Sequence, residues 1–194
     1  MEVLVEIPQT TPGGDLGLQA VARVGEQRVI ELVVDDAQAR IAQAWVPYHT
    51  ALKSLLDETH RHFGQAILID CHSMPHEAIE AHARPGHPRP DVVLGDRFGA
   101  AAGREVVERL EAAFAAAGLR VVRNSPFAGA YIAQAYGRPS RGFHVVQVEI
   151  DRALYMDEAR ILPLPGFEEF RRLMKGVIAD IADIGRVALP LAAE

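Results

Sequence analysis

The stretch Gln65–Pro75, QAILIDCHSMP, decides the fold class that this sequence predicts. Its apolar run, Ala66–Ile69, is bounded by polar residues on both sides. An apolar run without alternation is typical of a strand that is covered on both faces, as in a parallel sheet between helices. We therefore expect a buried central strand here, with the polar residues that follow it at its carboxyl end.

Reactive side chains follow this run directly, as Asp70, Cys71 and His72. Because side chains alternate along a strand, Asp70 and His72 should share one face, and Cys71 should lie on the other. Ligands of open α/β sheets gather at the carboxyl ends of strands, so His72 is a candidate ligand residue. The alternative is a histidine that is only hydrogen-bonded within a loop.

The composition limits the classes of protein that this chain can be. With 194 residues, 49% hydrophobic and 24% charged, residues 1–194 are expected to fold as a single domain with a substantial core. The net charge of −6 argues against a nucleic-acid surface. Cys71 is the only cysteine, which excludes an internal disulfide, and no apolar stretch is long enough to cross a membrane. We expect a cytoplasmic protein.

The first third of the chain predicts strands and then one long helix. The strand candidates are Met1–Ile7, Leu18–Val24 and Arg28–Val34, the last two joined as a hairpin. Asp36 is a plausible N-cap, and Gly64 a natural stop, for a helix that Pro47 should kink or divide. The spacing of its apolar residues predicts one buried stripe, made of Ile41, Trp45, Tyr48, Leu52, Leu55, Thr59 and Phe63.

Strands and helices alternate through the rest of the chain. After a Pro-rich loop at 74–90, the pattern predicts strands at Asp91–Leu94, Leu119–Val122 and Phe143–Ile150 and helices at Ala101–Ala117 and Phe167–Val187. This order predicts a three-layer α/β fold with a mostly parallel mixed sheet flanked by helices. The strand ends near residues 70–72, 96–97, 123–124 and 149–152 should then line one cleft.

Four motifs, in this order along the chain, together resemble the N-formylglutamate amidohydrolase family. They are LIDCHSMP (Leu68–Pro75), DVVLGDRFGA (Asp91–Ala100), NSPFAGAYIAQAYG (Asn124–Gly137) and HVVQVEIDRALYMDE (His144–Glu158), and PYHTALKSLLDETHRHFG (Pro47–Gly64) is similar to the family as well. The resemblance implies a zinc carboxypeptidase-like (phosphorylase/hydrolase-like) fold. It also implies zinc-dependent hydrolysis of the amide bond of an N-acyl acidic amino acid such as N-formyl-L-glutamate, a reaction of histidine degradation.

The same resemblance assigns roles to two residues of this chain. It implies that His72 is a zinc ligand and that Glu149 is the base that activates water. Members of the family carry two further ligands near their first strand, where this chain reads Gln9-Thr10-Thr11. A catalytic zinc normally has three protein ligands and one position left for water. Candidate substitutes are His49, His76, His82 and His87, although a histidine in a polar loop is usually only solvated.

Other polar residues in the motifs are candidates for binding the substrate. Arg97 and Arg152 could bind substrate carboxylates through paired hydrogen bonds, or could form structural ion pairs with Asp96 or Asp151. Asn124 could orient the substrate or cap a turn. Further candidates are Asp70, as a hydrogen-bond acceptor that orients His72, and Cys71, as a weak nucleophile beside the commoner inert buried thiol.

Three hypotheses follow, and each has a small acidic acyl-amino acid as its ligand. The first is the zinc-dependent amidohydrolase, with Glu149 as base; Glu149 could instead pair with Arg152 or Arg97. The second is a non-catalytic or metal-deficient relative that binds the same class of molecule. The third is an enzyme whose zinc site is completed by another chain or by the 74–90 loop. No nucleic-acid or membrane partner is expected, and the oligomeric state is left open.

Overall fold

The computed structural model describes residues 21–23, 29–31, 38–80 and 89–185, which form parts of two compact units, Met1–Ser54 and Leu55–Glu194. In the first, β1 (Val21–Arg23) and β2 (Val29–Glu31) pair antiparallel, which confirms the predicted hairpin with shorter strands. The predicted strand Met1–Ile7 and the N-cap Asp36 lie outside the described residues, and the single-domain expectation stays a prediction.

The long helix changes its hydrogen-bonding pattern just before Pro47 but is not divided there. The π-helical stretch η1 (Ile41–Trp45) passes directly into α2 (Val46–Phe63), and the flanking Arg40 and Val46 both have helical backbone angles. A π-helical stretch beside a proline accommodates the backbone N–H that proline lacks. Gly64 ends the helix with a φ of 72°, a left-handed conformation that glycine adopts without strain.

The predicted buried stripe of this helix is wrong. Within the second unit, Leu55 and Phe63 remain 62% and 70% exposed, whereas Leu56 is buried. The cause is the stacking of His60 on Phe143, with ring centroids 4.4 Å apart. Residues 56 and 60 lie one helical turn apart, so this contact turns the neighbouring stripe outward.

The second unit is built on a four-stranded sheet in the order β3-β6-β4-β5. The strands are β3 (Ala66–Met74), β6 (Phe143–Asp151), β4 (Val92–Gly95) and β5 (Val121–Arg123). β3 pairs parallel with β6, and β4 pairs parallel with β5, but β4 and β6 run antiparallel. The predicted α/β fold with a mostly parallel mixed sheet is therefore confirmed.

Two details of the predicted sheet are wrong. β3 is not central but stands at the edge of the sheet in the part of the chain that the structure describes. β4 and β5 run in the opposite direction to β3 and β6, because β4 pairs antiparallel with β6. Their carboxyl ends therefore lie at the other end of the sheet, measured along the strands. The hydrophobicity of a strand indicates which of its faces are buried. The direction of the strand and its position in the sheet depend instead on the path of the chain between strands.

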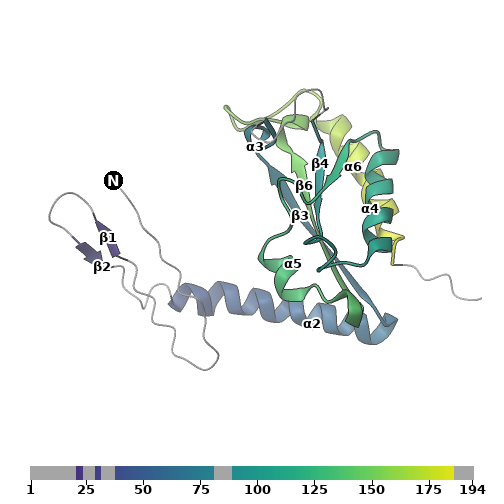
Figure 1. The fold of residues 1–194 in the computed structure, drawn as a ribbon. Helices are drawn as coiled ribbons and strands as arrows, with labels where there is room; N and C mark the ends of the chain where they lie inside the picture. The colour runs from purple at the N-terminus through teal and green to yellow at the C-terminus, as the bar shows by residue number, and fades with distance from the viewer. Residues whose placement is uncertain (1–20, 24–28, 32–37, 81–88, 186–194) are drawn as a thin grey trace, which may run out of the picture. The chain divides into compact units, whose positions relative to one another are not determined.

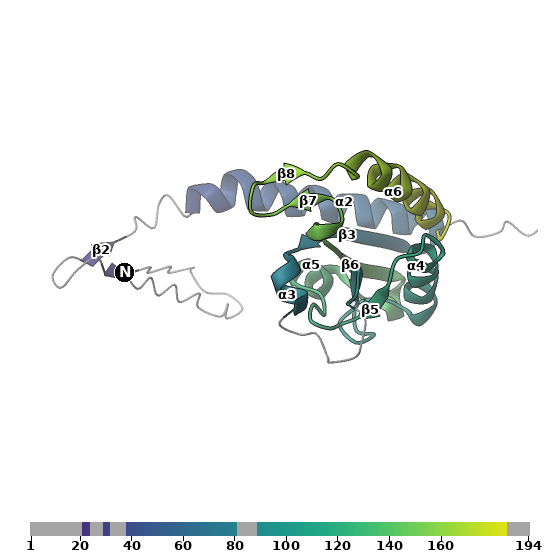
Figure 2. The ribbon, with the colours of Figure 1, turned by 90° about the horizontal axis from the view of Figure 1, so that it is seen from above.

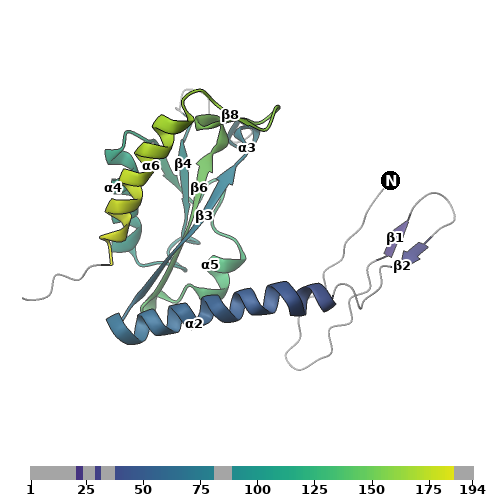
Figure 3. The same ribbon diagram turned by 180° about the vertical axis from the view of Figure 1, so that it is seen from behind.

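Helices cover both faces of the sheet, as Figures 1 and 3 show. α4 (Arg104–Ala116) and α6 (Phe167–Ala182) lie on one face, close to the predicted helices. They enclose the main hydrophobic cluster, which includes Val92, Leu94, Val106, Val107, Leu110, Phe114, Val146, Val148 and Val177. None of the helices in the described part of the chain is long and apolar enough to cross a membrane.

Two short helices cover the other face. α3 (His76–Glu80) forms within the predicted 74–90 loop, whose first residue, Met74, belongs to β3, and α5 (Tyr131–Tyr136) packs against β6. Figure 2 shows β3 and β6 between α6 on one side and α3 and α5 on the other. The remaining elements are the short helices η2 (Pro139–Arg141) and η3 (Arg152–Leu154) and the strand pair β7 (Met156–Asp157) and β8 (Leu162–Pro163).

Candidate active site

The face of the sheet that carries α3 and α5 also carries a row of polar side chains. Asp70 of β3 is the register partner of Gln147 of β6, and His72 is the partner of Glu149. Partners in a parallel pair point to the same side, so all four side chains share this face. His72 Nε2 lies 3.0 Å from Asp70 Oδ1. The predicted common face of Asp70 and His72 is confirmed, and His72 and Glu149 are neighbours across β3 and β6.

Glu149 is held by a neighbour on its own strand. Only 7% of Glu149 is exposed, and the Nε2 atom of Gln147 donates a hydrogen bond of 2.7 Å to its Oε1 atom. Neither Arg97 nor Arg152 pairs with Glu149; the ion-pair partner of Arg152 is Glu158, 3.6 Å away. Among the described residues, the second oxygen of Glu149 has no hydrogen-bond partner. One carboxylate oxygen is therefore fixed by a neighbour on the same strand.

Arg97 lies in the turn after β4, where the backbone is strained. Arg97 and Phe98 have φ values of 54° and 55°, which non-glycine residues rarely adopt. The Nη1 atom of Arg97 donates to the carbonyl of Gly129 at 3.3 Å. The guanidinium has other N–H groups, so this single bond leaves donors for a ligand.

Asn124 holds this turn in place. Its Oδ1 atom accepts the backbone N–H groups of Asp96 and Phe98 at 3.1 and 3.3 Å, and its Nδ2 atom donates to Asp96 Oδ1 at 2.6 Å. Asp96 also accepts the N–H of Gly99, so its carboxylate serves the turn and does not pair with Arg97. The turn-cap alternative for Asn124 is therefore present in the structure, with one side-chain N–H left over.

Arg152 lies at the shared carboxyl edge of β3 and β6. It donates to Ser73 Oγ at 3.1 Å and to the Ser73 carbonyl at 3.2 Å, beside its ion pair with Glu158. The expected alternative partner, Asp151, instead accepts a hydrogen bond from the backbone N–H of Ala153. The guanidinium is thus oriented by the end of β3, with part of its surface exposed.

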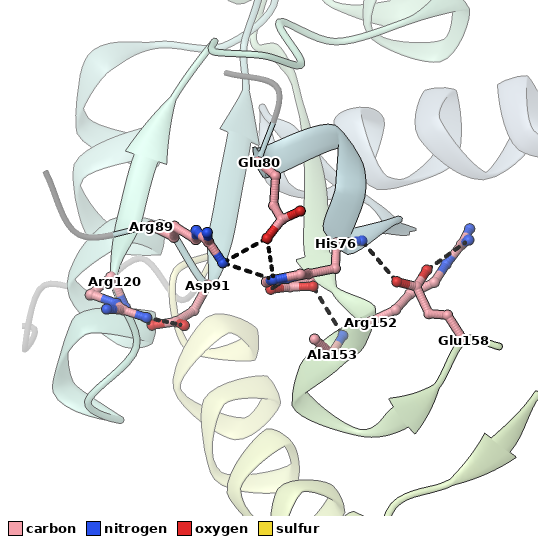
Figure 4. Close-up of polar contacts among 9 residues, drawn as sticks. His76, Glu80, Arg89, Asp91, Arg120, Arg152, Ala153 and Glu158 are labelled. Atoms are coloured by element: carbon pink, nitrogen blue, oxygen red, sulfur yellow. Dashed lines mark hydrogen bonds and ion pairs between the residues drawn. The ribbon is translucent and has the colours of Figure 1, made fainter. Parts of the chain in front are cut away.

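A second polar cluster at this edge was not predicted from the sequence, and Figure 4 shows it. His76 Nδ1 lies 2.8 Å from the buried Asp151 Oδ2, and His76 Nε2 lies 3.2 Å from Arg89 Nη1. Arg89 in turn pairs with Glu80 at 3.0 Å. Both ring nitrogens of His76 therefore have protein partners. No sequence spacing could have indicated this cluster, because His76 and Asp151 are brought together only by the pairing of β3 with β6.

The described residues do not by themselves fit a catalytic zinc. No three or more histidine, cysteine, aspartate or glutamate side chains gather there in a way that could hold a metal ion. A catalytic zinc needs three such ligands. Among the described residues, one fully buried side-chain oxygen lacks a hydrogen-bond partner: Asp70 Oδ2, beside His72. Of the suggested substitutes, His82 and His87 lie outside the described residues, and His49 belongs to the first unit.

Cys71 does not have the surroundings of a nucleophile. Its side chain lies on the opposite face from His72, as predicted. Cys71 is an exposed residue, but partial burial of its sulfur, with a smaller effect from the negative charge of Asp70, raises the pKa of the thiol. A raised pKa keeps the thiol protonated at neutral pH, and the thiolate is the reactive form.

A cavity lies on the other face of the sheet. It is a groove of about 860 Å³ next to Ile67 and Ile69 of β3, bordered also by Phe63 of α2 and Ile181 of α6. These strand residues alternate with Asp70 and His72, so the groove is separated from the polar row by the sheet itself. It takes no part in the candidate site.

Comparisons with known proteins agree with this architecture. The family model of N-formylglutamate amidohydrolase matches residues 6–156. The chain is 38% identical over 119 residues to an N-formylglutamate deformylase of Pseudomonas aeruginosa, covering 61% of this chain and 44% of the relative. It is 34% identical over 147 residues to the N-formylglutamate deformylase of Pseudomonas putida, covering 75% and 51%. The chain spans about half the length of the curated relatives it matches.

Two solved structures share the fold of this chain. The crystal structure of N-formylglutamate amidohydrolase from Ralstonia eutropha superposes with a TM-score of 0.69 at 31% identity, over 78% of this chain and 54% of that one. A gene product of Agrobacterium tumefaciens, at 17% identity and a TM-score of 0.50, shares the fold alone and covers 80% of this chain and 57% of its own. The chain belongs to the N-formylglutamate amidohydrolase family.

Proposed function

We propose that this protein hydrolyses the amide bond of an N-acyl acidic amino acid, with N-formyl-L-glutamate as the substrate to test first. The observation that carries the proposal is the state of Glu149. This carboxylate is buried opposite His72, with one oxygen fixed by Gln147 and the other without a partner among the described residues. We also propose a cytoplasmic location, where a single unpaired cysteine is usual.

In this reaction Glu149 acts as general base and then as general acid. It accepts the proton of the attacking water through its unbonded oxygen and delivers that proton to the leaving amine. The requirement is a carboxylate within hydrogen-bond reach of the water, held in one orientation. The bond from Gln147 supports this role, because it restricts the rotation of the Glu149 side chain.

The arginines supply positive charge for the acidic substrate. We propose that Arg97 binds one substrate carboxylate with the N–H groups that its bond to Gly129 does not use. Arg152 would bind a second carboxylate in exchange for its 3.6 Å contact with Glu158. Asn124 would orient the substrate with its remaining N–H and, through the turn that it caps, would hold Arg97 in place.

Zinc remains a proposed cofactor, with His72 as its ligand and Asp70 orienting the imidazole. A bound zinc would polarise the acyl carbonyl and acidify water. Because the described residues do not provide three ligands, we propose that the chain alone binds zinc weakly or not at all. Any further ligands would have to come from outside the described residues or from another chain.

The incomplete ligand set also favours a second candidate function. A metal-deficient relative could retain the arginines and bind an acidic acyl-amino acid without hydrolysing it. Binding without turnover would then require Arg97 but not Glu149.

Two measurements on the purified chain separate these proposals. The zinc content is determined before and after dialysis against a mild chelator, and formate release from N-formyl-L-glutamate is followed with and without added zinc. Formate release that is lost in Glu149→Gln would support the hydrolase. Binding of N-formyl-L-glutamate with no formate release, even with zinc, would favour the binding protein instead.

Glu149→Gln is a suitable variant because it should fold. The amide oxygen of the new side chain can still accept the hydrogen bond from Gln147. We expect kcat to fall by about a hundredfold or more, with KM much less affected. Glu108→Gln, on the exposed surface of α4, is the matched control and should retain the parent rate. Formate release by Glu149→Gln at the parent rate would remove Glu149 from the mechanism.

A further inference from the structure

We propose that Gln147 is a positioning residue for the base, and that it links Glu149 to the backbone segment 128–130. This inference rests on the proposed function, which it deepens. Gln147 is 4% exposed and has no room for a solvent-facing role. Its side chain lies in the polar row of the α5-bearing face, between Asp70 on β3 and Gly95 on β4.

The oxygen and the nitrogen of the Gln147 side-chain amide both form hydrogen bonds, and these bonds fix the orientation of the amide. Its Oε1 atom accepts the backbone N–H of Ala130 at 2.7 Å, and its Nε2 atom donates to Glu149 Oε1 at 2.7 Å. The N–H of Ala130 can only donate, so it fixes the amide oxygen on its own side. The amide nitrogen must then face Glu149, which makes Gln147 an obligatory donor to the base.

The segment 128–130 is itself fixed by β4. A Cβ atom on Gly95 would lie 2.5 Å from the backbone nitrogen of Gly129, so backbone packs directly on backbone at this point. The N–H of Arg97 donates to the carbonyl of Ala128 at 2.7 Å, and the Arg97 side chain donates to the carbonyl of Gly129. Gln147 therefore connects the base to the same segment that orients Arg97.

As a consequence, only one of the two carboxylate oxygens of Glu149 is left to interact with a ligand. With Oε1 held by Gln147, the unbonded oxygen of Glu149 is the one that can reach a ligand above His72. A base that can rotate spends less time in the reactive geometry, and small misplacements cost large factors in rate. Gln147 should therefore affect kcat and leave substrate binding largely unchanged.

Gln147→Glu tests this proposal with little change in shape. The new side chain can still accept the N–H of Ala130. As a carboxylate it places a like charge beside Glu149, and as a carboxylic acid it shares its proton with Glu149, so in either state the fixed amide N–H donor is lost and the acid–base state of Glu149 changes. We expect kcat for formate release to fall about tenfold or more, with KM within about twofold of the parent value. Gln134→Glu, the same substitution on the exposed side of α5, is the control and should retain the parent kcat.

Two kinetic results would overturn the proposal. One is a parent-like kcat in Gln147→Glu. The other is a rise in KM as large as the fall in kcat, since that would make Gln147 a binding residue and not a positioning one.

A stability cycle tests the same link without any activity. Gln147→Glu should lower Tm by about 3–8 °C, because the amide N–H donor to Glu149 is lost and two acidic groups are left to share one buried site. In the exchanged double variant, Gln147→Glu with Glu149→Gln, residue 149 becomes the donor and residue 147 the acceptor. Tm should then return to within about 3 °C of the parent, while catalysis stays lost for want of a base.

This cycle separates failure of the inference from failure of the proposed function. A parent chain that releases no formate would reject the hydrolase, yet recovery of Tm in the double variant would still support the link between residues 147 and 149. A double variant that is no more stable than the sum of its two single changes would overturn the link, whatever the activity.

Discussion

Asp91→Asn should destabilise the second unit measurably, because Asp91 is a buried carboxylate at the start of β4. It is 8% exposed and accepts three hydrogen bonds from Arg120. The backbone N–H and Nε of Arg120 donate to Oδ2 at 2.8 and 3.0 Å, and Nη2 donates to Oδ1 at 2.9 Å. These bonds join the start of β4 to the residue just before β5, as Figure 4 shows in part.

The expected loss of stability follows from the hydrogen bonds that remain in Asp91→Asn. An asparagine keeps one oxygen for the buried donors, but its NH₂ group would face the guanidinium. Hydrogen bonds to charged groups contribute about 1.5–3 kcal/mol and neutral ones about 0.5–1.5. The Arg120 side chain is 54% exposed, so solvent screening reduces its ion pair to about 1 kcal/mol or less. We expect Asp91→Asn to cost about 1–2 kcal/mol and to lower Tm by about 2–8 °C.

The effect should depend on pH in a defined direction. Burial would raise the pKa of Asp91, but the hydrogen bonds and charge of Arg120 outweigh it, so the pKa is lowered overall. A folded-state pKa below the unfolded value, about 3.9, means that the carboxylate stabilises the fold above about pH 4. That contribution is lost as pH falls through the folded-state pKa.

Thermal unfolding of the parent and of Asp91→Asn, followed by circular dichroism from pH 3 to 8, measures both effects. The difference in Tm between the parent and Asp91→Asn should be constant from pH 6 to 8 and should become smaller below pH 4. Glu108→Gln, in the exposed pair with Arg104, is the control and should leave Tm unchanged. A parent-like Tm at pH 7, or a gap that persists at pH 3, would refute the reasoning.

Three further predictions concern other sites. Burial raises the pKa of Cys71, so alkylation by iodoacetamide at pH 7 should be slower than for free cysteine and should accelerate as pH rises; a faster rate would contradict this. Gly95→Ala places its Cβ 2.5 Å from the Gly129 nitrogen and should cost about 3 kcal/mol or prevent folding, whereas Gly176→Ala, with open space inside α6, should add about 1 kcal/mol to the free energy of unfolding. Burial lowers the pKa of His144, so its contribution is present above pH 6.5 and lost as pH falls; His144→Gln should flatten the change in Tm between pH 7 and 5, and an unchanged slope would contradict it.

Local patterns determined the elements and the direction of their side chains. The apolar run before Asp70 predicted β3, and the period of two placed Asp70 and His72 together on one face. The same period put Gln147 and Glu149 on one side of β6. These predictions succeeded because alternation is a property of one extended strand and needs no partner. The motifs that resemble the amidohydrolase family also lie within single elements and the turns after them.

Contacts between distant segments were decided only by the tertiary structure. The reversal of β4 against β6 depends on the path of the chain, so the strand ends did not pool at one edge as expected. The buried face of α2 is set by the stacking of His60 on Phe143, 83 positions along the sequence from it, which no helical period reports.

For the candidate site, too, some features follow from the sequence and others only from the tertiary structure. The sequence by itself determined the residue types on β3 and β6, including the acid at 149. Only the fold decided that His72 faces Glu149, that Gln147 joins this acid to the backbone of Ala130, and that His76 lies against Asp151. The physical reason is that a hydrogen bond needs donor and acceptor within about 3 Å, and strand pairing and loop closure set such distances between segments far apart in the chain.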